Sequence, residues 1–272
     1  MKNNLRTLYL IPSPIGNLND ISPRIKEAIL DCDIIACEDT RNTMKLLNIL
    51  NFKKPCISCH EHNEAQSSKN ISKYFLENKK VGFLSDAGFP CISDPGYYLV
   101  LEAIKNDVKI IPISGPSAFL NALVASGIST EHFTFYGFLK SKSSDRKREL
   151  ELLKKKSETL IFYEAPHRIN DTLVDIFEIF GNRKCTIARE ITKIHEEFIR
   201  SDLKTLVENK REIIGEIVLI VEGNSMEETI SEKEIKDKVN ILIENGLTKK
   251  DAILSVSILL NVPKNSIKKL FL

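Results

Sequence analysis

The sequence predicts an α/β protein with a mostly parallel sheet, a second mixed sheet and a small helical extension at the C-terminus. Three observations carry this prediction. Short apolar runs alternate with amphipathic stretches through the first half of the chain, as in the βαβ units of a parallel sheet. From His132 the apolar runs become more strongly β-branched and alternate with polar residues, which favours a mixed, partly antiparallel sheet. After Gly223 the spacing of apolar residues is helical.

The first half contains five expected strands, and the stretches between them carry helical spacing, such as Ile25 and Ile29. The carboxyl ends of parallel strands share one edge of the sheet, so we expect the loops that follow these strands to cluster there. The five strands are Thr7–Ile11, Ile34–Cys37, Cys56–Ser58, Val81–Leu84 and Lys109–Ile113.

The second half adds five more expected strands and then three helices, with Pro263 separating the last two helices. We expect domains at 1–128, 129–224 and 225–272, the last of them resembling a helix-turn-helix arrangement. The strands are 133–139, Thr159–Tyr163, Cys185–Ala188, Glu196–Arg200 and Glu216–Val221, and the helices are Glu232–Glu244, Lys249–Leu260 and Lys264–Leu270.

Composition limits the class of protein. A formal net charge of +2 is too small for the field of the whole protein to attract polyanions, so any affinity for them must come from local patches. Locally, residues 140–156 carry eight Lys or Arg against three acidic residues, and residues 248–272 carry five Lys against one Asp. Segments of this kind bind a phosphate backbone or form a solvated helix face, and their positions at the domain junction and on the extension favour RNA.

Six cysteines in apolar surroundings, without an export signal, indicate free thiols in a reducing cytoplasm. Cys56, Cys59, His60 and His62 have the residue types of a zinc site, but one seven-residue run would need an unusually tight loop, so we expect no metal. The longest uncharged run contains prolines and a glycine, and we expect no membrane span.

Three polar loops follow expected strands: Ile11–Leu18, Ser85–Gly96 and Ile113–Ala118. None has the G-x-x-x-x-G-K-[ST] or G-x-G-x-x-G pattern, which argues against ATP and dinucleotides. Backbone N–H groups near Gly88 and Gly115 suit a carboxylate, so a ligand built from an adenosine and an amino acid fits. In the second loop we expect Ser93 or Asp94 to cap the following helix.

The motifs together resemble the small-subunit rRNA cytidine 2′-O-methyltransferases of the tetrapyrrole methylase superfamily. They occur in the order of that family and cover nearly all of residues 7–223. Four positions depart from the usual pattern, namely Ser13, Phe89, Ser114 and Ala165, and Phe89 has the largest consequence because it would replace a hydroxyl with a phenyl ring at the cofactor. The matching segments are SPIGNL (13–18), EDTR (38–41), HEHNE (60–64), SDAGFPCISDPG (85–96), GPSA (115–118), GFL (137–139), EAPHR (164–168), AREITK (188–193) and GEIVLIVEG (215–223).

The resemblance implies a two-domain tetrapyrrole-methylase-like fold, S-adenosylmethionine as cofactor in a cleft between the α/β domains, and a homodimer that acts on small-subunit rRNA or the 30S subunit. The expected cofactor-binding residues are Pro14, Asp86, Ala87, Gly88, Ser117, Ala118, Tyr163, Glu164, Ala165, Gly215, Glu216 and Ile217. The expected RNA-binding residues are Arg41, His60, His62, Lys140, Lys142, Arg146, Arg168, Lys249 and Lys250.

A ribose 2′-hydroxyl is a poor nucleophile, so a general base should assist the reaction. The candidates are Glu38, Asp39, His60, Glu61, His62 and Asp94. We favour the Glu38/Asp39 pair, with Arg41 placing the RNA and Glu61 as a further catalytic residue. This interpretation predicts that Asp39→Asn abolishes methylation while the cofactor still binds.

Three other functions remain open at this stage. A methylase of the same fold could act on a porphyrinoid or on a protein, although the basic segments count against a small macrocycle. A non-catalytic RNA-binding protein on this scaffold would not need the acidic loops. A metal hydrolase built on His60 and His62 is disfavoured because the chain has no H-E-x-x-H helix.

Overall fold

The computed structural model describes residues 6–60, 63–224, 232–260 and 262–271. The chain divides into two compact units, Met1–Asn224 and Ser225–Leu272. The first unit contains two five-stranded sheets, and the second is helical. Each unit is described by itself below.

The first sheet is entirely parallel and has the strand order β3-β2-β4-β1-β5. The central strands β1 and β4 pair in register from Thr7 opposite Lys80 to Ile11 opposite Leu84. Their apolar residues are buried on both faces, which explains the continuous apolar runs in the sequence. The strands are β1 Thr7–Ile11, β2 Ile34–Cys37, β3 Cys56–Ser58, β4 Lys80–Leu84 and β5 Lys109–Pro112.

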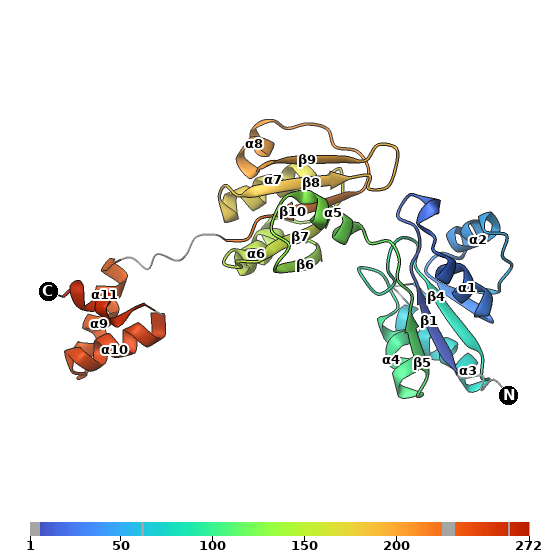
Figure 1. Ribbon diagram of the computed structural model, residues 1–272, viewed down its shortest axis with the longest axis horizontal. Helices are drawn as coiled ribbons and strands as arrows, with labels where there is room; N and C mark the ends of the chain where they lie inside the picture. Colours follow the sequence, from blue (N-terminus) through green and yellow to red (C-terminus); the bar gives the residue numbers. More distant parts are fainter. Residues whose placement is uncertain (1–5, 61–62, 225–231, 261, 272) are drawn as a thin grey trace. The chain divides into compact units, whose positions relative to one another are not determined.

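Helices cover both faces of this sheet (Figure 1). Helices α1 and α2 pack on the face that contains Ile11 and Ile35, whereas α3 and α4 pack on the face that contains Leu8 and Phe83. Neighbouring strand residues thus enter opposite cores, as the alternation of side chains along a strand requires. The elements are η1 Leu18–Asp20, α1 Pro23–Asp31, α2 Thr40–Ile49, α3 Glu64–Leu76 and α4 Tyr97–Lys105.

The second sheet is mixed and has the order β6-β7-β10-β8-β9. Strands β6 and β7 are parallel, and the remaining pairs are antiparallel. The register of β6 shifts between Phe135 and Gly137, where Gly137 has a φ of 82°. The strands are β6 Phe133–Phe138, β7 Thr159–Glu164, β8 Lys184–Arg189, β9 Glu197–Asp202 and β10 Ile217–Val221.

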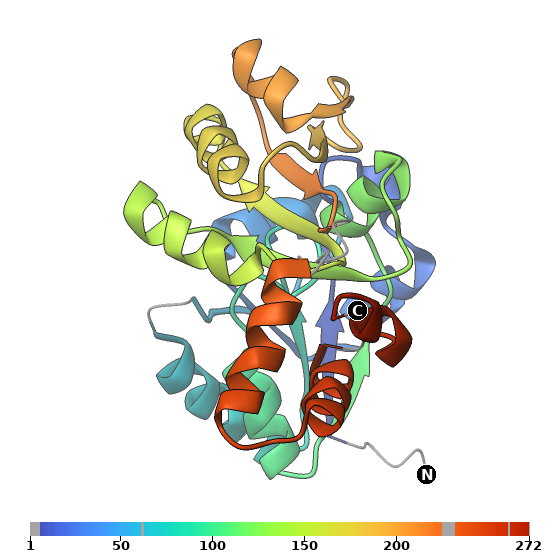
Figure 2. The ribbon, with the colours of Figure 1, turned by 90° about the vertical axis from the view of Figure 1, so that its left-hand side faces the viewer.

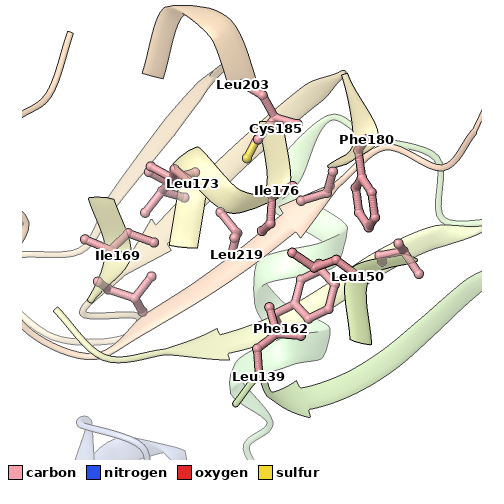
Figure 3. Packing of buried hydrophobic residues seen from close by; sticks show 14 of the residues in the cluster. Leu139, Leu150, Phe162, Ile169, Leu173, Ile176, Phe180, Cys185, Leu203 and Leu219 are labelled. Atoms are coloured by element: carbon pink, nitrogen blue, oxygen red, sulfur yellow. The ribbon is translucent and has the colours of Figure 1, made fainter. Parts of the chain in front are cut away.

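One face of the second sheet packs against α6 Ser143–Leu153, α7 Ile169–Phe180 and α8 Leu203–Glu208. Figure 3 shows this core, in which Phe162 and Leu219 of the sheet lie among side chains from the helices. The other face packs against α5 Ala118–Ser126, whose Ala122 and Leu123 are buried. The chain therefore crosses from the first core to the second in the loop before α5.

The second unit contains α9 Glu232–Glu244, α10 Lys249–Leu260 and α11 Lys264–Lys269. Figure 2 shows these three helices gathered together. They enclose a small core of their own that includes Val239, Val256 and Ile267. Thr248 accepts a hydrogen bond from the Asp251 N–H, so Thr248 caps α10.

The predicted fold class is confirmed: a parallel sheet, a mixed sheet and a helical extension appear in the predicted order. The domain boundaries at 128 and 224 stay predictions. In the described residues no helix is both long and apolar enough to cross a membrane.

Candidate functional site

A cavity of about 620 Å³ lies in the first unit and is lined by residues from both sheets. Its floor comes from the Ser85–Gly96 loop, and the start of α5 and the ends of β7 and β10 complete it. We call it the apolar cavity because most of its lining side chains are apolar. The lining residues are Ile15, Ala87, Gly88, Phe89, Ile92, Ser93, Asp94, Ser117, Ala118, Phe119, Leu120, Phe138, Tyr163, Glu164, Ala165, Pro166, Ile191, Glu216, Ile217 and Val218.

The floor loop is tied to the loop that follows β1. Ser13 and Gly88 exchange two backbone hydrogen bonds, of 2.9 and 3.0 Å. The Ser13 hydroxyl donates to the Ser85 carbonyl, and the Ser85 hydroxyl donates to the Gly88 carbonyl. Gly88 has a φ of 71°, a conformation that favours glycine, so this turn depends on the residue type at position 88.

The loop before α5 packs against the same β1 loop. A Cβ atom at Gly115 would overlap the ring of Pro12, so the close approach of the two loops requires glycine there. Ser117 then forms the N-cap position of α5 and lines the apolar cavity with Ala118. The three loops that the sequence singles out are therefore brought together.

Glu64 of α3 fixes the end of the floor loop. Its Oε1 accepts hydrogen bonds from the N–H groups of Gly96, at 2.8 Å, and Tyr98, at 2.9 Å. These are the first N–H groups of α4, whose N-cap is Gly96. The expectation that Ser93 or Asp94 caps this helix is wrong, because a carboxylate from another helix does so.

Aromatic side chains form one wall of the apolar cavity. Phe119 and Phe135 stack with ring centroids 4.5 Å apart, and Phe135 meets Tyr163 edge to face at 4.9 Å. Burial raises the pKa of Tyr163 to about 12, so its hydroxyl stays protonated at neutral pH. Phe138, which is more than half exposed, packs against the same tyrosine.

Glu164 lines the apolar cavity, but protein groups already bind both of its carboxylate oxygens. Oε1 accepts from Arg168 Nε and from the Ala165 N–H, each at 2.7 Å, and Oε2 accepts from Thr172 at 2.6 Å. Arg168 also donates to Ser141 at 2.8 Å. The donors of Arg168 thus hold Glu164 and the loop after β6 in place, and its expected contact with RNA stays a prediction.

Gly215, an expected cofactor-binding residue, does not line the apolar cavity. A Cβ atom there would overlap Glu190, whose Oε1 accepts from Lys193 at 2.8 Å and from the Glu216 N–H at 2.9 Å. A Cβ atom at Gly16 of the β1 loop would likewise overlap the Lys193 side chain. Gly215 thus permits the packing that supports Glu216 at the cavity.

A second cavity of about 440 Å³ lies at the edge of the first sheet, and we call it the polar cavity. Glu38, Asp39, Thr40, Arg41, Ser58, His60 and Asp86 line it. Asp86 and Ala87 are consecutive residues, and they line the polar and the apolar cavity respectively. The polar clusters after β2, β3 and β4 therefore converge here as the sequence predicts.

Asp39 and Arg41 form a bidentate pair in the polar cavity. Asp39 Oδ2 lies 2.7 Å from Arg41 Nη2, and Oδ1 accepts from Arg41 Nε at 3.1 Å. Oδ1 also accepts from the Arg41 N–H at 2.8 Å, which caps α2. These bonds lower the pKa of Asp39 to about 2, so its carboxylate is a weak base. The Arg41 side chain is 82% exposed and keeps donors for a ligand.

The role of Asp86 in cofactor binding stays a prediction. The resemblance predicts it in the cofactor pocket, but its carboxylate faces the polar cavity. Asp86 Oδ2 accepts from Asn42 Nδ2 at 2.9 Å, and Oδ1 accepts from the Asp39 N–H at 3.4 Å. Asp86 therefore joins the floor loop to the start of α2.

Most of the other expected cofactor residues line the apolar cavity, whereas Pro14 does not and its neighbour Ile15 does. Sequence reasoning missed the apolar wall residues Ile92, Phe119 and Val218, which have no signal beyond ordinary core hydrophobicity. Phe89, the departure with the largest expected consequence, does line the cavity.

The expected RNA-binding cations divide into exposed and buried groups. Lys140, Lys142, Lys249 and Lys250 are exposed, and of these Lys249 donates to the Phe271 carbonyl at 3.3 Å. Arg146 is only 3% exposed, and its guanidinium lies 2.6 Å from Asp175. The expectation for Arg146 is therefore wrong, because α6 turns this side chain into the core.

Two expected site residues, Glu61 and His62, lie outside the described residues. Within the described ranges, no three His, Cys, Asp or Glu side chains group in a way that would hold a metal ion.

Known proteins resemble this chain in sequence over most of its length. Residues 7–207 match the model of the family "Tetrapyrrole (Corrin/Porphyrin) Methylases". A protein of Bacillus subtilis named "Ribosomal RNA small subunit methyltransferase I" is 41% identical, over 98% of this chain and 94% of that protein. A protein of the same name from Thermotoga maritima is 42% identical, over 79% of this chain and 98% of that protein.

Among solved structures, a uroporphyrin-III-C-methyltransferase from Thermus thermophilus superimposes with a TM-score of 0.56 at 12% identity. The match covers 80% of this chain and 92% of that one. At this identity the likeness concerns the fold alone.

Proposed function

Because the chain belongs to the tetrapyrrole (corrin/porphyrin) methylase family, in the branch of the small-subunit rRNA methyltransferases I, it is an rRNA methyltransferase. We propose that its methyl donor is S-adenosylmethionine and that its acceptor is the ribose 2′-hydroxyl of a cytidine in small-subunit rRNA. The observation that carries this proposal is a pair of cavities that the consecutive residues Asp86 and Ala87 line: the apolar cavity, and the polar cavity with its exposed Arg41.

The apolar cavity fits the proposed donor in size and chemistry. Its volume of about 620 Å³ lies in the range of cavities that enclose small-molecule ligands. Aromatic and aliphatic walls suit an adenine ring, and the N-terminus of α5, where Ser117 makes no side-chain cap hydrogen bond, suits the carboxylate of an amino acid. Ala87, Gly88, Ala118 and Ile217 would hold the donor, together with Tyr163.

When bound, S-adenosylmethionine supplies a methyl group that its sulfonium already activates. The protein then has to hold the ribose oxygen in line with that methyl group and exclude competing water. The aromatic wall and the Phe89 ring leave few polar groups to bind water near the donor. A cavity lined mostly by apolar side chains supports positioning as the main source of acceleration.

We propose that Arg41 binds an RNA phosphate at the mouth of the polar cavity, with Asp39 as its positioning partner. The bidentate pair orients the guanidinium and leaves most of it exposed, as phosphate recognition requires. His60 and Glu38 line the same cavity and would face the target nucleotide. Lys140, Lys142, Lys249 and Lys250 offer further charge for the RNA backbone.

The strength of the Asp39–Arg41 pair changes what we expect of Asp39→Asn. A carboxylate with a pKa of about 2 is poorly suited to take a proton, so we expect weaker RNA binding rather than loss of chemistry. The variant should raise the KM for RNA by about tenfold while kcat stays nearly unchanged. If the variant instead turns over at least about 100 times more slowly with saturating RNA, Asp39 returns to the role of base.

The main test uses the full chain with radiolabelled S-adenosylmethionine and either naked rRNA or 30S subunits, with 50S subunits as the control. Label should enter the small-subunit RNA alone. Alkaline hydrolysis should leave the labelled nucleotide joined to its 3′ neighbour, because a 2′-O-methyl group blocks cleavage at that bond. Absence of label from all RNA would refute the proposal, and label in a base would refute the ribose as acceptor.

We also propose that the chain acts as a homodimer in the cytoplasm. An exposed apolar stripe on α4, formed by Tyr97, Leu101 and Ile104, supports a contact surface on the first unit. Light scattering of the purified chain tests the assembly, and a monomer at micromolar concentration would contradict it.

A further inference from the structure

Phe138, the last residue of β6, is an exposed aromatic side chain at the mouth of the apolar cavity. It lines that cavity, and yet 56% of it is exposed. In the described part of the chain it is the one exposed aromatic side chain that lines either cavity. Ile92 and Leu120 line the same cavity and are also exposed. The mouth of the apolar cavity is therefore an apolar surface in contact with solvent.

The bulge in β6 turns Phe138 toward the cavity. Phe135 pairs with Ile161 and Phe138 pairs with Tyr163, so a step of three residues in β6 matches a step of two in β7. In a regular strand, residues 135 and 138 would face opposite sides of the sheet. The extra residue near Gly137, whose φ is 82°, brings both phenylalanines to the side where Tyr163 lies. The fold thus spends a bulge on aiming this one ring.

Neighbouring contacts fix the Phe138 ring while most of the residue stays exposed. Its centroid lies 5.5 Å from that of Tyr163, with an angle of 58° between the two rings. On either side in the chain, Gly137 and Leu139 are buried, and Leu139 belongs to the core of the second sheet. The ring can therefore offer its exposed surface to a ligand without a rearrangement of the backbone.

Two exposed lysines, Lys140 and Lys142, follow Phe138 on the loop to α6. The loop that carries them is held in place, because Arg168 Nη1 donates to the Ser141 hydroxyl at 2.8 Å. An aromatic ring beside cations is the arrangement with which proteins bind unpaired nucleotides. In such sites the ring stacks on a base, and the cations bind the phosphates next to it.

The chemistry of this mouth fits a nucleotide of the acceptor better than the methyl donor. Phe138, Ile92 and Leu120 suit the flat face of a base, and the two lysines need an anion beside it. Each nucleotide of rRNA supplies both groups. The donor would supply only a carboxylate, for which the N-terminus of α5 is suited.

We propose that Phe138 stacks on an unpaired base of the rRNA at the mouth of the apolar cavity. The base is that of the methylated nucleotide or of a direct neighbour, because methyl transfer brings this ribose to the donor. This inference rests on the proposed function. Stacking holds the acceptor at the mouth, and Lys140 and Lys142 bind the adjoining phosphates. Phe138 is thus a substrate-binding residue and takes no part in bond making.

The first experiment compares the full-length wild type with Phe138→Ala, Phe138→Leu, Phe138→Trp and the control Phe133→Ala, with 30S subunits or rRNA as acceptor. Phe133 is 41% exposed at the other end of β6 and lines neither cavity. We expect Phe138→Ala to raise the KM for RNA by about tenfold or more, while the Kd for S-adenosylmethionine changes less than about threefold. Phe138→Trp should match the wild type, and Phe138→Leu should fall between, since leucine has no aromatic face. Phe133→Ala should match the wild type.

The second experiment uses salt to separate stacking from charge. Stacking releases no counterions, so Phe138→Ala should leave the slope of log KM against log salt concentration unchanged. Lys142→Gln should lower that slope by about 0.7–1, because one phosphate contact is lost. An equal fall of the slope in both variants would show that Phe138→Ala disturbs the basic loop, and it would overturn stacking.

The third experiment identifies the base. Photoreactive p-benzoylphenylalanine at position 138 should crosslink to the methylated nucleotide or to a direct neighbour, which a stop of reverse transcription locates. The same group at position 133 should give no crosslink there. A crosslink from position 138 only to distant nucleotides, or none to RNA, would contradict the proposal.

The outcomes separate the inference from the proposed function. A wild-type protein that labels no RNA refutes the proposed function, and the role of Phe138 falls with it. An active wild type with a KM for Phe138→Ala within about threefold of its own overturns stacking and leaves the proposed function standing. A Kd for S-adenosylmethionine that rises as much as the KM for RNA would assign Phe138 to the donor site instead.

Discussion

Replacing Glu64 tests whether one buried carboxylate holds α4 and the floor loop of the apolar cavity. Glu64 is 9% exposed and accepts from two backbone N–H groups, at 2.8 and 2.9 Å. The N-cap residue Gly96 has no side chain to replace it. Each hydrogen bond to a charged acceptor contributes about 1.5–3 kcal/mol, and the helix dipole adds about 0.3–1 kcal/mol.

These contributions do not add fully, because desolvation of the carboxylate offsets part of them. We expect Glu64→Ala to lower the free energy of local opening of α4 by about 3 kcal/mol, and Glu64→Gln, which keeps an acceptor oxygen, by about 1 kcal/mol. In amide hydrogen exchange these values correspond to roughly 150-fold and fivefold faster exchange of the protected amides of Tyr97–Lys105.

The control is Glu77→Ala, which removes an exposed carboxylate that pairs with Lys79 at the other end of α3. An exposed pair of this kind contributes little, so exchange in α4 should match the wild type. If Glu64→Ala and Glu77→Ala exchange at the same rate throughout α4, the capping role assigned to Glu64 is refuted.

Two stability predictions follow from packing. Gly223→Ala should lower the free energy of unfolding by about 3 kcal/mol, because its Cβ would overlap the backbone carbonyl of Ser157. Gly127→Ala should cost only about 1 kcal/mol from its left-handed helical backbone, because its Cβ would make only an ordinary contact, 3.9 Å from Arg200. Urea denaturation of both variants measures this difference, and equal midpoints would contradict it. Arg146→Met should cost about 3–5 kcal/mol because it removes the closest cation from the buried Asp175 and leaves it only Lys147 at 3.6 Å and the Ser143 hydroxyl, and adding Asp175→Leu should restore most of that loss. A double variant as unstable as the single one would count against the buried pair as the cause.

Much of the fold could be predicted from the sequence because a strand buried on both faces needs apolar residues at every position. The strands expected at Thr7–Ile11 and Glu216–Val221 therefore agree closely with the observed strands Thr7–Ile11 and Ile217–Val221. The three loops that contribute to the apolar cavity were equally visible, because glycine, proline and polar residues directly after such runs are typical of a functional sheet edge.

Two assignments that were made only from neighbouring residues in the sequence were wrong. Arg146 belongs to the most basic stretch of the chain, yet the packing of α6 against α7 buries it beside Asp175. Asp94 precedes a helix and has the residue type of an N-cap, yet Glu64, thirty residues earlier, caps that helix. A contact between residues so far apart leaves no periodic pattern in the sequence.

The sequence by itself determined the order of the elements, the fold class and the family, because periodicity and motifs are local properties of the chain. Tertiary structure alone decided which polar residues share a cavity and what their neighbours do to them. Asp39 and Asp94 are the same residue type in two loops of one sheet edge. An arginine two residues away lowers the pKa of Asp39 to about 2, whereas burial beside Glu38 and Asp86 raises the pKa of Asp94 to about 7. The difference is electrostatic, and it exists only once the strands place these carboxylates together.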